Sequence, residues 1–512
     1  MAIETDVYES PGWWLNRLAT ELHERRAGRR GSKRYSRRGV ESSRVRPGLC
    51  FIDDYLRGDP PLRDDIHSDW SAPFRQFLRM GRMNVAPLLI SSTANRMTVR
   101  DFRTAAANDE LGDIEARALM RRNNLRLKTR EVHDDMLGLG DGYTIVTPPD
   151  SARAWSLITA ESPMQCITAH DPATGATLAG LKMFRDDWDA SDWAYLFLPG
   201  ELYVARADVR SSTLFGRAPF VLSQQWVWDF DRFDTIPDGR VAMVRFRNKG
   251  GLSELEGYID TLDRINDKLF NEWWIGKIQA FRQRALKLPD EADDDPEFDQ
   301  ALGDEMERQD NLLQTFDVTR PMPDDLKGMF TSSPDAMWTL PKGAEIWESG
   351  TVDVTNMVDS IKAELQWLAS VKSLPMHSIT PDAANGSAEG ASLQREEHVY
   401  TIEDRIDRAH GGWAETMAMA FAFQGDKERS DVAQIDPLWG PTERYSLAEK
   451  TDSAQKLNAG SDQPALPWEA IATDVLQYAP GDVIDRLKPL RGADLLYAAP
   501  APTPGHVGTR GA

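Results

Sequence analysis

The sequence predicts an α+β fold in which long helices stand beside a group of short strands. Residues 253–288 contain no proline and repeat apolar side chains at steps of three and four, the spacing of one helical face. Between about residues 143 and 246, short apolar runs alternate with turn sequences such as DPATG and PDG, which is typical of strands. Two more segments with helical spacing follow, at 352–374 and from about 387 to 423. Helices that flank such strands indicate an α+β architecture.

The composition excludes several classes of protein. A chain of 512 residues with 41% hydrophobic residues is long enough for several packed domains. Its two cysteines, Cys50 and Cys166, are too few for a disulfide framework and fit a reducing compartment. The N-terminus lacks the basic and apolar regions of a signal peptide, and the longest apolar run, 417–423, is too short to span a bilayer. We therefore expect a soluble, unexported protein that makes no membrane contact.

A strongly basic segment lies near the N-terminus of an acidic chain. The net charge of −21 argues against a general nucleic-acid binder, whereas residues 25–46 contain ten basic residues and one acid. This segment follows a predicted amphipathic helix at 11–27 and is poor in apolar residues. Two interpretations stay open: a contact with nucleic acid or an acidic partner protein, and a solvated loop. The candidate contact residues are Arg29, Arg30, Lys33, Arg34, Arg37 and Arg38.

The region between the basic segment and the long helix is expected to combine helices with strands. Residues 73–105 and 109–140 mix apolar stripes with arginines and are predicted to be helical. The glycine-rich sequence at 138–142 precedes a strand instead of following one, which favours a turn over a dinucleotide-binding loop. The predicted strands are 143–147, 178–184, 193–197, 202–205 and 241–246.

The predicted long helix at 253–288 organises the rest of the chain. At 1.5 Å per residue it would reach about 50 Å, and helices of this length normally lie against equivalent helices in a bundle or an oligomer. No heptad pattern is sustained, so a simple coiled coil is not favoured. The residues expected to form its packing face are Leu255, Ile259, Leu262, Ile265, Leu269 and Trp273.

An acidic segment and a loop interrupt the helices that follow. Residues 290–325 contain fourteen acids and two basic residues, and they predict a small protruding subdomain. These carboxylates could bind a hard cation, but the spacing of a calcium loop is missing, so a solvated acidic surface is favoured. Residues 376–390 are small, polar or turn-forming and predict a loop between two helix ends. Shorter helices are predicted at 446–457 and 468–476, before a loose tail.

The sequence contains no recognisable catalytic motif. The signatures of zinc proteases, serine hydrolases, phosphate-binding loops and paired-cysteine metal sites are all missing. Residues 133–135 and 396–398 each combine one histidine with two acids, but both groups lie on predicted helices and are interpreted as exposed polar faces. We therefore expect no enzyme activity, no cofactor, no metal site and no nucleotide hydrolysis.

Several blocks of sequence, in the same order, carry a resemblance to a known family. The most specific stretch is DTLDRINDKLFNEWWIGKIQAFRQRALK, with DRIN at 263–266 and QAFRQR at 279–284. The other blocks are 53–62, 158–175, 344–349, 368–379, 385–390 and 446–457. Together they make the chain resemble, over roughly residues 50–460, the portal proteins of tailed bacteriophages, in the branch common in phages of actinobacteria. The chain departs from that branch at Thr401, where a lysine is common, at Leu288-Pro289, which replace a glycine, and in its longer basic segment.

The resemblance implies a ring, typically of twelve subunits, at one vertex of the phage head, through which double-stranded DNA passes during packaging and ejection. The implied division of the chain is an N-terminal helix with a basic arm at 1–49, a wing at 50–250, a first stem helix at 251–288, a clip at 289–351, a second stem helix at 352–374, a tunnel loop at 375–390, a long wing helix at 391–430, and a crown with a flexible tail at 431–512. The channel residues of the tunnel loop would be His377, Ser378, Thr380, Asp382, Asn385, Ser387 and Glu389.

The resemblance also implies partners and a location. The partners would be other copies of the chain, the DNA, the terminase large subunit that hydrolyses nucleotide and docks on the clip, a head–tail adaptor, and the major capsid and scaffold proteins. The protein would reside at the portal vertex of the virion, and in the host cytoplasm during assembly. Twelve chains at −21 each would carry about −250, a field that repels DNA and lets it slide. Three alternatives stay open: a head or tail protein without a channel, a DNA-processing enzyme, and, for the tunnel loop, an ordinary surface loop.

Overall fold

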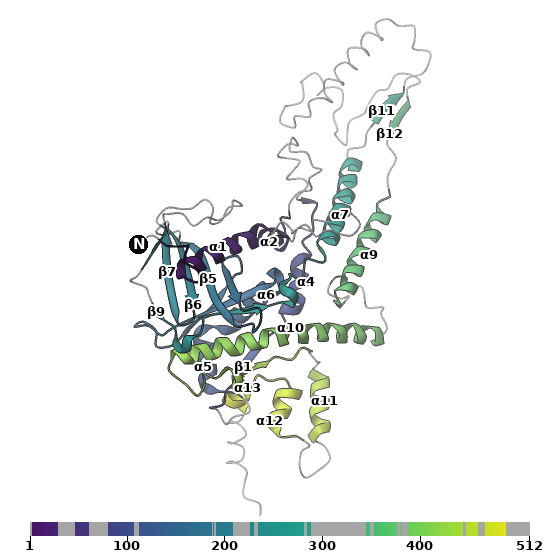
Figure 1. Cartoon of the computed structure of the whole chain (residues 1–512). Coiled ribbons are helices and arrows are strands. Elements are labelled where there is room, and N and C mark those ends of the chain that lie inside the picture. The colour runs from purple at the N-terminus through teal and green to yellow at the C-terminus, as the bar shows by residue number, and fades with distance from the viewer. Residues whose placement is uncertain are drawn as a thin grey trace, which may run out of the picture. The chain divides into compact units, whose positions relative to one another are not determined.

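The chain divides into two compact units (Figure 1). The first unit consists of residues 1–269 and 361–512, and the second of residues 270–360. The computed structural model describes residues 3–28, 47–60, 80–106, 112–186, 188, 191–207, 226–229, 234–280, 284–287, 345–348, 353–375, 379, 388–443, 447–458 and 466–487. The observed mixture of helices and antiparallel sheets is the α+β class that the sequence predicts.

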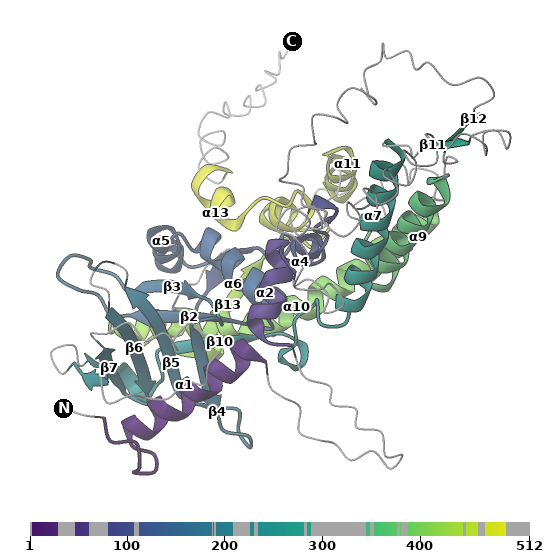
Figure 2. The ribbon, with the colours of Figure 1, turned by 90° about the horizontal axis from the view of Figure 1, so that it is seen from above.

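The largest sheet of the first unit has six antiparallel strands. The strand order is β4-β5-β6-β7-β8, and β9 pairs with β7. The bounds are β4 Cys166–His170, β5 Thr177–Asp186, β6 Ser191–Leu198, β7 Glu201–Ala207, β8 Trp226–Trp228 and β9 Asp234–Thr235. Helix α1 (Pro11–Ala27) crosses one face of this sheet (Figure 2), and its Leu15, Leu18 and Leu22 pack there in a shared apolar core. The helix predicted at 11–27 is therefore confirmed.

A smaller antiparallel sheet has the strand order β10-β2-β3, with bounds β10 Met243–Arg247, β2 Asp141–Thr147 and β3 Leu157–Glu161. Helix α6 (Leu125–Leu139) ends just before β2, and Gly140 between them has a φ of 90°, a left-handed conformation that glycine adopts easily. The predicted turn at 138–142 is therefore reduced to Gly140, because Gly138 and Leu139 still belong to α6 and Asp141 and Gly142 already belong to β2. The predictions at 143–147 and 241–246 correspond to β2 and β10, whereas β3 and β4 were not predicted.

The longest helix is α10 (Ala388–Phe423), which packs along β2 and β10. Its Gly412 faces Phe246, and a Cβ at this position would lie 2.6 Å from a carbon of the phenyl ring. Only glycine permits this close approach of helix and sheet. The helix predicted from about 387 to 423 is confirmed, and just after its end Gly425, with a φ of 78°, turns the chain.

Two predicted long helices are wrong in detail. In the stretch 73–105, helix α4 (Ala86–Ala94) ends and strand β1 (Val99–Arg103) follows. Strand β1 pairs with β13 (Asp436–Trp439), a partner so far along the chain that the local sequence gives no sign of it. In the stretch 109–140, α5 (Ile114–Asn123) and α6 are separate helices, because Asn124 adopts a left-handed φ of 51° between them. Helix α2 (Leu49–Arg57) had no prediction.

The helix predicted at 253–288 is shorter than expected. Helix α7 spans Ile259–Ala280, and the residues just before it form turns. Ser253 causes part of this change: its hydroxyl donates to the Gly138 carbonyl and accepts the Leu255 N–H at 3.0 Å, which fixes the chain in a turn. After the helix, β11 (Arg284–Lys287) occupies residues that had been predicted to be helical. It pairs with β12 (Glu345–Glu348) inside the second unit.

The remaining helices are short or close to their predicted places. Helix α9 (Thr355–Val371) lies within the predicted 352–374, and α11 (Leu447–Asn458) matches the helix predicted at 446–457. The prediction at 468–476 corresponds to α12 (Trp468–Ala470) continued by a π-helical turn, and a second π-helical turn follows α13 (Pro480–Asp482). Three 3-10 turns complete the described elements, at Pro237–Gly239, Lys249–Gly251 and Val432–Gln434.

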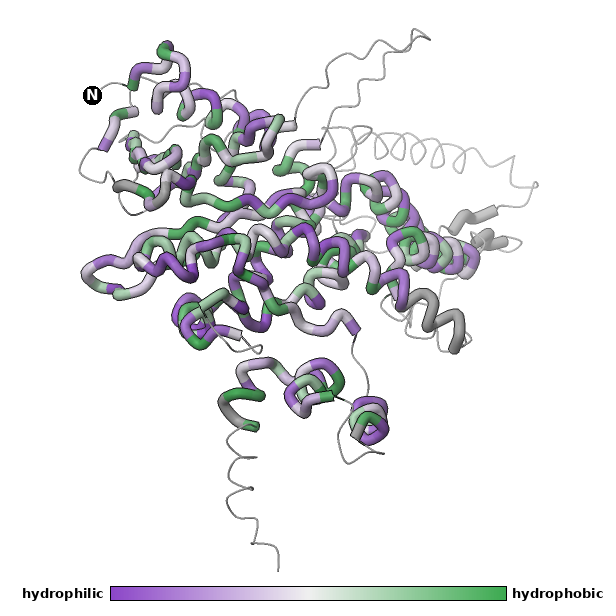
Figure 3. Tube along the Cα trace, turned by 60° about the horizontal axis from the view of Figure 1, so that its bottom comes forward, coloured by the Kyte–Doolittle hydropathy of each residue, from purple (hydrophilic) through white to green (hydrophobic). Residues whose placement is uncertain are grey.

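Hydrophilic and hydrophobic residues alternate along the helices (Figure 3). Within the part of the chain that the structure describes, no helix is both long enough and apolar enough to cross a membrane.

Candidate functional site

The predicted packing face of the long helix lies against the core of the chain itself. Leu255, Leu262 and Ile265 are buried in the main apolar core of the first unit. Ile259 and Leu269 are partly buried against the same core, and Trp273 lies in the second unit, half-buried. The periodic face of α7 therefore joins this helix to its own chain.

Helices α7 and α9 are linked by one carboxylate. Glu364 of α9 accepts two hydrogen bonds from Arg264 of α7, at 2.9 Å from Nε and 2.8 Å from Nη2, and one from Lys268 at 2.9 Å. Hydrogen bonds from Arg264 and then Lys268 lower the pKa of Glu364, so it stays ionised near neutral pH. The Arg264 side chain is 52% exposed, so water and salt reach this link.

A second carboxylate joins three elements where α7 and α9 meet the body of the unit. Glu254, just before α7, forms ion pairs with Lys372, just after α9, and with Arg405 of α10, whose Nε lies 2.7 Å from Oε1. Asn248 also donates to this carboxylate at 3.1 Å. Burial alone would raise the pKa of Glu254, but Lys372 and Arg405 together lower it. The start of α7, the end of α9 and α10 are therefore held at one point.

Helix α9 exposes apolar side chains close to Glu364. Trp367 is 64% exposed and Val371 is 71% exposed, and the two residues are four positions apart, so they share one face of the helix. Tyr400 on α10 is also 64% exposed. Large apolar groups that stay in water on a paired helix indicate a surface suited to a protein contact.

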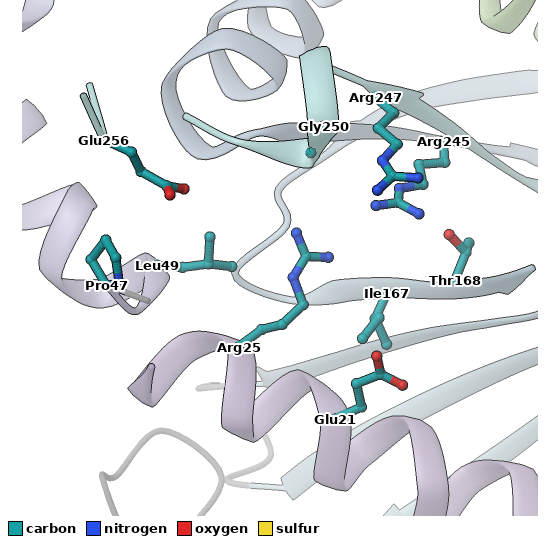
Figure 4. A pocket seen from close by; sticks show the side chains of 11 residues that line it. Glu21, Arg25, Pro47, Leu49, Ile167, Thr168, Arg245, Arg247, Gly250 and Glu256 are labelled. Atoms are coloured by element: carbon teal, nitrogen blue, oxygen red, sulfur yellow. The ribbon is translucent and has the colours of Figure 1, made fainter. Parts of the chain in front are cut away.

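Residues 29–46, which hold the six candidate contact residues of the basic arm, lie outside the described residues. The two ends of the arm are close together, because a Cβ on Gly48 would lie 2.5 Å from the backbone nitrogen of Gly28. Beside them is a cavity of about 250 Å³ into which Arg25, Arg245 and Arg247 project (Figure 4). Glu21 and Glu256 also line this cavity, so its charge is mixed.

The arginines of this cavity are partly neutralised by a buried aspartate. Asp141, at the start of β2, is fully buried. It accepts hydrogen bonds from Arg245 at 2.7 and 3.0 Å and forms an ion pair with Arg25 of α1. Arg25 also donates to the Tyr143 hydroxyl at 3.4 Å, and burial raises the pKa of Tyr143 to about 12. This buried ion-pair cluster connects the end of α1 to the smaller sheet, so its role is structural.

The predicted tunnel loop is almost entirely outside the described residues. His377, Ser378, Thr380, Asp382, Asn385 and Ser387 are not described, and Glu389 lies in α10 without a described side chain. At the near end of the loop, Leu374 and Pro375 are buried, and further along it Ile379 is partly buried against the main core. The acidic segment 290–325 and most of the predicted clip at 289–351 also lie outside the described residues.

The prediction that the two histidine–acid groups form exposed polar faces is wrong for their histidines. His133 is fully buried, and His398 is 1% exposed, although Glu396 and Glu397 are exposed as expected. Nδ1 of His133 lies 2.9 Å from the Met97 carbonyl, and Nε2 accepts the Trp413 indole N–H at 2.9 Å. Burial lowers the pKa of His133 to about 4, so its neutral form fits this polar site inside the core. Among the described residues, no group of three or more His, Cys, Asp or Glu side chains could hold a metal ion.

Sequence reasoning missed the ionic joints at Glu254 and Glu364. A signal for one of them existed, because Arg264 and Lys268 are four residues apart and so share a face of α7. The identity of their partner, Glu364, could not be inferred, because it lies 100 residues further along the chain.

A protein-family model described as "Phage portal protein, SPP1 Gp6-like" matches residues 42–468. A comparison with curated protein sequences returns no match. Among solved structures, the chain is similar to a chain of "Virion of native gene transfer agent (GTA) particle", with 13% identity, a TM-score of 0.40, and 77% of this chain and 89% of that chain covered. It is also similar to a chain of "Neck of native GTA particle computed with C12 symmetry", with 12% identity, a TM-score of 0.38, and 78% and 89% covered.

Proposed function

The chain belongs to the phage portal protein family, SPP1 Gp6-like, and we propose that it assembles into a ring-shaped channel at one vertex of the capsid. Double-stranded DNA would pass through this channel during packaging and ejection. The observation that carries the proposal is the family match, which spans residues 42–468 of the 512. A protein of this structural family acts by shape and charge, and we assign the chain no catalytic role.

The division of the chain into wing, stem, clip, tunnel loop and crown belongs to the same proposal. The two helices that would form the stem, α7 and α9, are joined by Glu364 and anchored by Glu254, which supports a paired stem. The wing would correspond to the sheets at 50–250 together with α10. The loop at 375–390 would face the channel, and the clip at 289–351 would receive the terminase large subunit and later a head–tail adaptor.

The charge of the chain supports a conduit for DNA. A channel must not hold its DNA, because each phosphate contact made by a Lys or Arg adds affinity that slows sliding. A ring of twelve chains at −21 each would carry about −250, which repels DNA from the walls of the channel. The major capsid and scaffold proteins would surround the ring during assembly in the host cytoplasm, and the ring would remain in the virion.

We place one contact between neighbouring subunits on the exposed side of α9. On α9, Glu364 and Leu368 are buried within the chain, whereas Trp367 and Val371, at the edge of the same face, stay exposed. A second copy of the chain that covered Trp367 would remove a large apolar surface from water, and tryptophan is enriched among residues that dominate interfaces. In a ring, each subunit would offer this face to a different surface of the next subunit.

The test is ring assembly by the full chain, observed by mass photometry and negative-stain microscopy. We expect rings with a central hole for the unmodified protein. The double variant Trp367→Ala/Val371→Ser should shift the population toward monomers, with an assembly midpoint raised by about tenfold or more in protein concentration, the loss expected when one central tryptophan is removed.

The matched control is Trp188→Ala. Trp188 is 99% exposed, so its removal also deletes an exposed indole but leaves α9 intact. Assembly of this control should equal that of the unmodified protein. Monomers alone from the unmodified chain, across salt and protein concentrations, would refute the ring. Rings of undiminished stability from the α9 variant would refute the assigned contact.

A further inference from the structure

The carboxylate of Glu254 bridges a lysine and an amide. Lys372, just after α9, forms an ion pair with Oε2 of this carboxylate, and Nδ2 of Asn248 lies 3.1 Å from Oε1. Nδ2 also donates to the Leu252 carbonyl at 2.8 Å, and the backbone N–H of Asn248 donates to the Gly140 carbonyl at 3.1 Å. The amide of Asn248 is therefore fixed at one oxygen of the carboxylate, and the amine of Lys372 at the other.

The orientation of the Asn248 amide follows from its neighbours. The Glu254 carboxylate and the Leu252 carbonyl are both acceptors, so the side that faces them must be the nitrogen, which donates, and not the oxygen. The amide oxygen Oδ1 is buried, and among the described residues it accepts no hydrogen bond. A buried amide oxygen without a donor is unusual in folded proteins. Hydrogen bonding alone therefore does not explain an asparagine at this position.

Little water reaches this site. The side chains of Lys372, Glu254 and Arg405 are at most 13% exposed, and Asn248 is buried. The ring of Tyr258 lies 5.8 Å from Nζ of Lys372. Burial lowers the pKa of Lys372 below its ordinary value although Glu254 opposes this, and the positive charge of Arg405 lowers it further. Such surroundings favour the neutral amine, which is the nucleophilic form of lysine.

We propose that Lys372 and Asn248 form an isopeptide bond inside the folded chain, with Glu254 as the group that transfers the protons. Nζ of Lys372 is the nucleophile, Nδ2 of Asn248 is the leaving group, and Glu254 contacts both nitrogens. Attack requires Nζ to come within about 3–3.5 Å of Cγ, and the shared carboxylate holds the two groups as neighbours. The reaction occurs once in each chain, without turnover, and it does not depend on the proposed ring.

The atoms and charges of the reaction balance at the site. Glu254 takes a proton from the ammonium of Lys372, and the electron pair freed on Nζ forms a bond to Cγ of Asn248. The carboxyl group of Glu254, beside the amide, stabilises the negative charge that develops on Oδ1. The Cγ–Nδ2 bond then breaks. Two protons pass in total from Nζ through Glu254 to Nδ2, so the nitrogen leaves as an ammonium ion and the carboxylate is restored. Nothing is oxidised or reduced.

The bond would join the start of α7 to the end of α9 covalently. Residues 248 and 372 enclose the whole second unit, 270–360, so the bond would close this part of the chain into a loop. A closed loop lowers the conformational entropy of the unfolded chain. An amide bond is also insensitive to salt, unlike the ion pair from which it would form.

The test is the intact mass of the denatured full chain, measured after purification in the folded state and again after one week at pH 8. We expect a mass lower than the sequence mass by one ammonia molecule. Fragmentation of a tryptic digest should find a branched peptide in which Lys372 is joined to Asn248. Lys372→Arg keeps the positive charge but has no amine, and Glu254→Gln cannot transfer the protons, so both variants should have the full sequence mass.

The matched control is Lys268→Arg. Lys268 also pairs with a shielded carboxylate, Glu364, at 2.9 Å, but the other partner of this carboxylate is the guanidinium of Arg264 and not an amide. The control should lose one ammonia molecule, as the unmodified chain does. Circular dichroism of every variant shows whether it is folded, because an unfolded chain would also keep its full mass.

The unmodified chain decides the outcome even if a variant does not fold. Its full sequence mass after the incubation would overturn the proposal. So would a loss of ammonia without a branched peptide, which would assign the loss to cyclisation of an asparagine on its own backbone. A loss of one water molecule, with Lys372 joined to Glu254, would also contradict the assigned pair. The bond forms within one chain, so none of these results bears on ring assembly.

Discussion

The sheets of the first unit, called the body here, and the helix pair α7 and α9 differ in how well their ion pairs are shielded from water. In the body, Asp141 is fully buried, and the side chains of its partners Arg25 and Arg245 are only 18% and 16% exposed. Between α7 and α9, Glu364 is also shielded, but the side chain of its partner Arg264 is 52% exposed. A carboxylate paired with two cations is therefore shielded from water in the body and accessible to water between α7 and α9.

This difference in exposure predicts which ion pairs contribute most to stability and which respond to salt. A buried carboxylate that loses its charge leaves its cations unpaired in a medium that cannot solvate them, which is strongly destabilising. An exposed pair gains little, because water solvates its members and salt screens them. The body should therefore behave as a rigid frame, whereas the angle between α7 and α9 should respond to salt.

The largest expected effect is that of Asp141→Asn. The substitution keeps the shape of the side chain but leaves Arg25 and Arg245 without their anion, and we expect a loss of about 3–5 kcal/mol in the free energy of unfolding. Urea unfolding followed by tryptophan fluorescence measures the change. The control Asp452→Asn removes a carboxylate that is 61% exposed and paired with Lys456, and it should leave the unfolding midpoint almost unchanged. A midpoint for Asp141→Asn equal to that of the control would contradict the rigid frame.

The next effect concerns the response of the body to acid. Burial lowers the pKa of His133 from 6.5 to about 4, so between these values the unfolded chain binds the proton more strongly than the folded chain does. The contribution of His133 to stability is therefore complete above pH 6.5 and is lost as the pH falls toward 4, a loss of about 3 kcal/mol at most. Thermal unfolding midpoints recorded from pH 7.5 to 4.5 should fall.

The matched variant is His133→Gln, which can still accept from Trp413 and donate to the Met97 carbonyl but does not titrate. His398 is also buried, and burial also lowers its pKa to about 4. The acid-dependent loss should therefore shrink in the variant but should not vanish. An unchanged pH profile would show that His133 is not the buried neutral group that the structure describes.

The smallest expected effect is that of Glu364→Gln between α7 and α9. Because Arg264 and Lys268 remain accessible to water, we expect at most about one fifth of the loss caused by Asp141→Asn, and less at 1 M salt. Urea unfolding at low and high salt measures both quantities. A loss as large as that of Asp141→Asn, or one that is independent of salt, would remove the distinction between frame and projecting helices.

The sequence by itself determined the elements whose pattern is local. The helix at Pro11–Ala27 follows from its apolar spacing and from Ser10, whose side chain accepts the Trp13 N–H at 3.2 Å. Helices α9 and α10 and the strands β2, β5, β6, β7 and β10 follow from periods of 3.6 and 2 that can be read without knowing any distant residue. The ordered blocks of sequence also indicated the portal family, which the match over residues 42–468 confirms.

Only the tertiary structure decided which polar groups are buried and which residues leave a helix. Arg25 meets Asp141 across 116 residues and Lys372 meets Glu254 across 118, so neither ion pair is visible in a local pattern. His133 looks like part of a polar helical face until Trp413, 280 residues away, donates to it in the core. The turn at Ser253 likewise depends on Gly138, to which its hydroxyl donates. Periodicity reports the geometry of a single backbone segment, whereas burial depends on what the rest of the chain places against that segment.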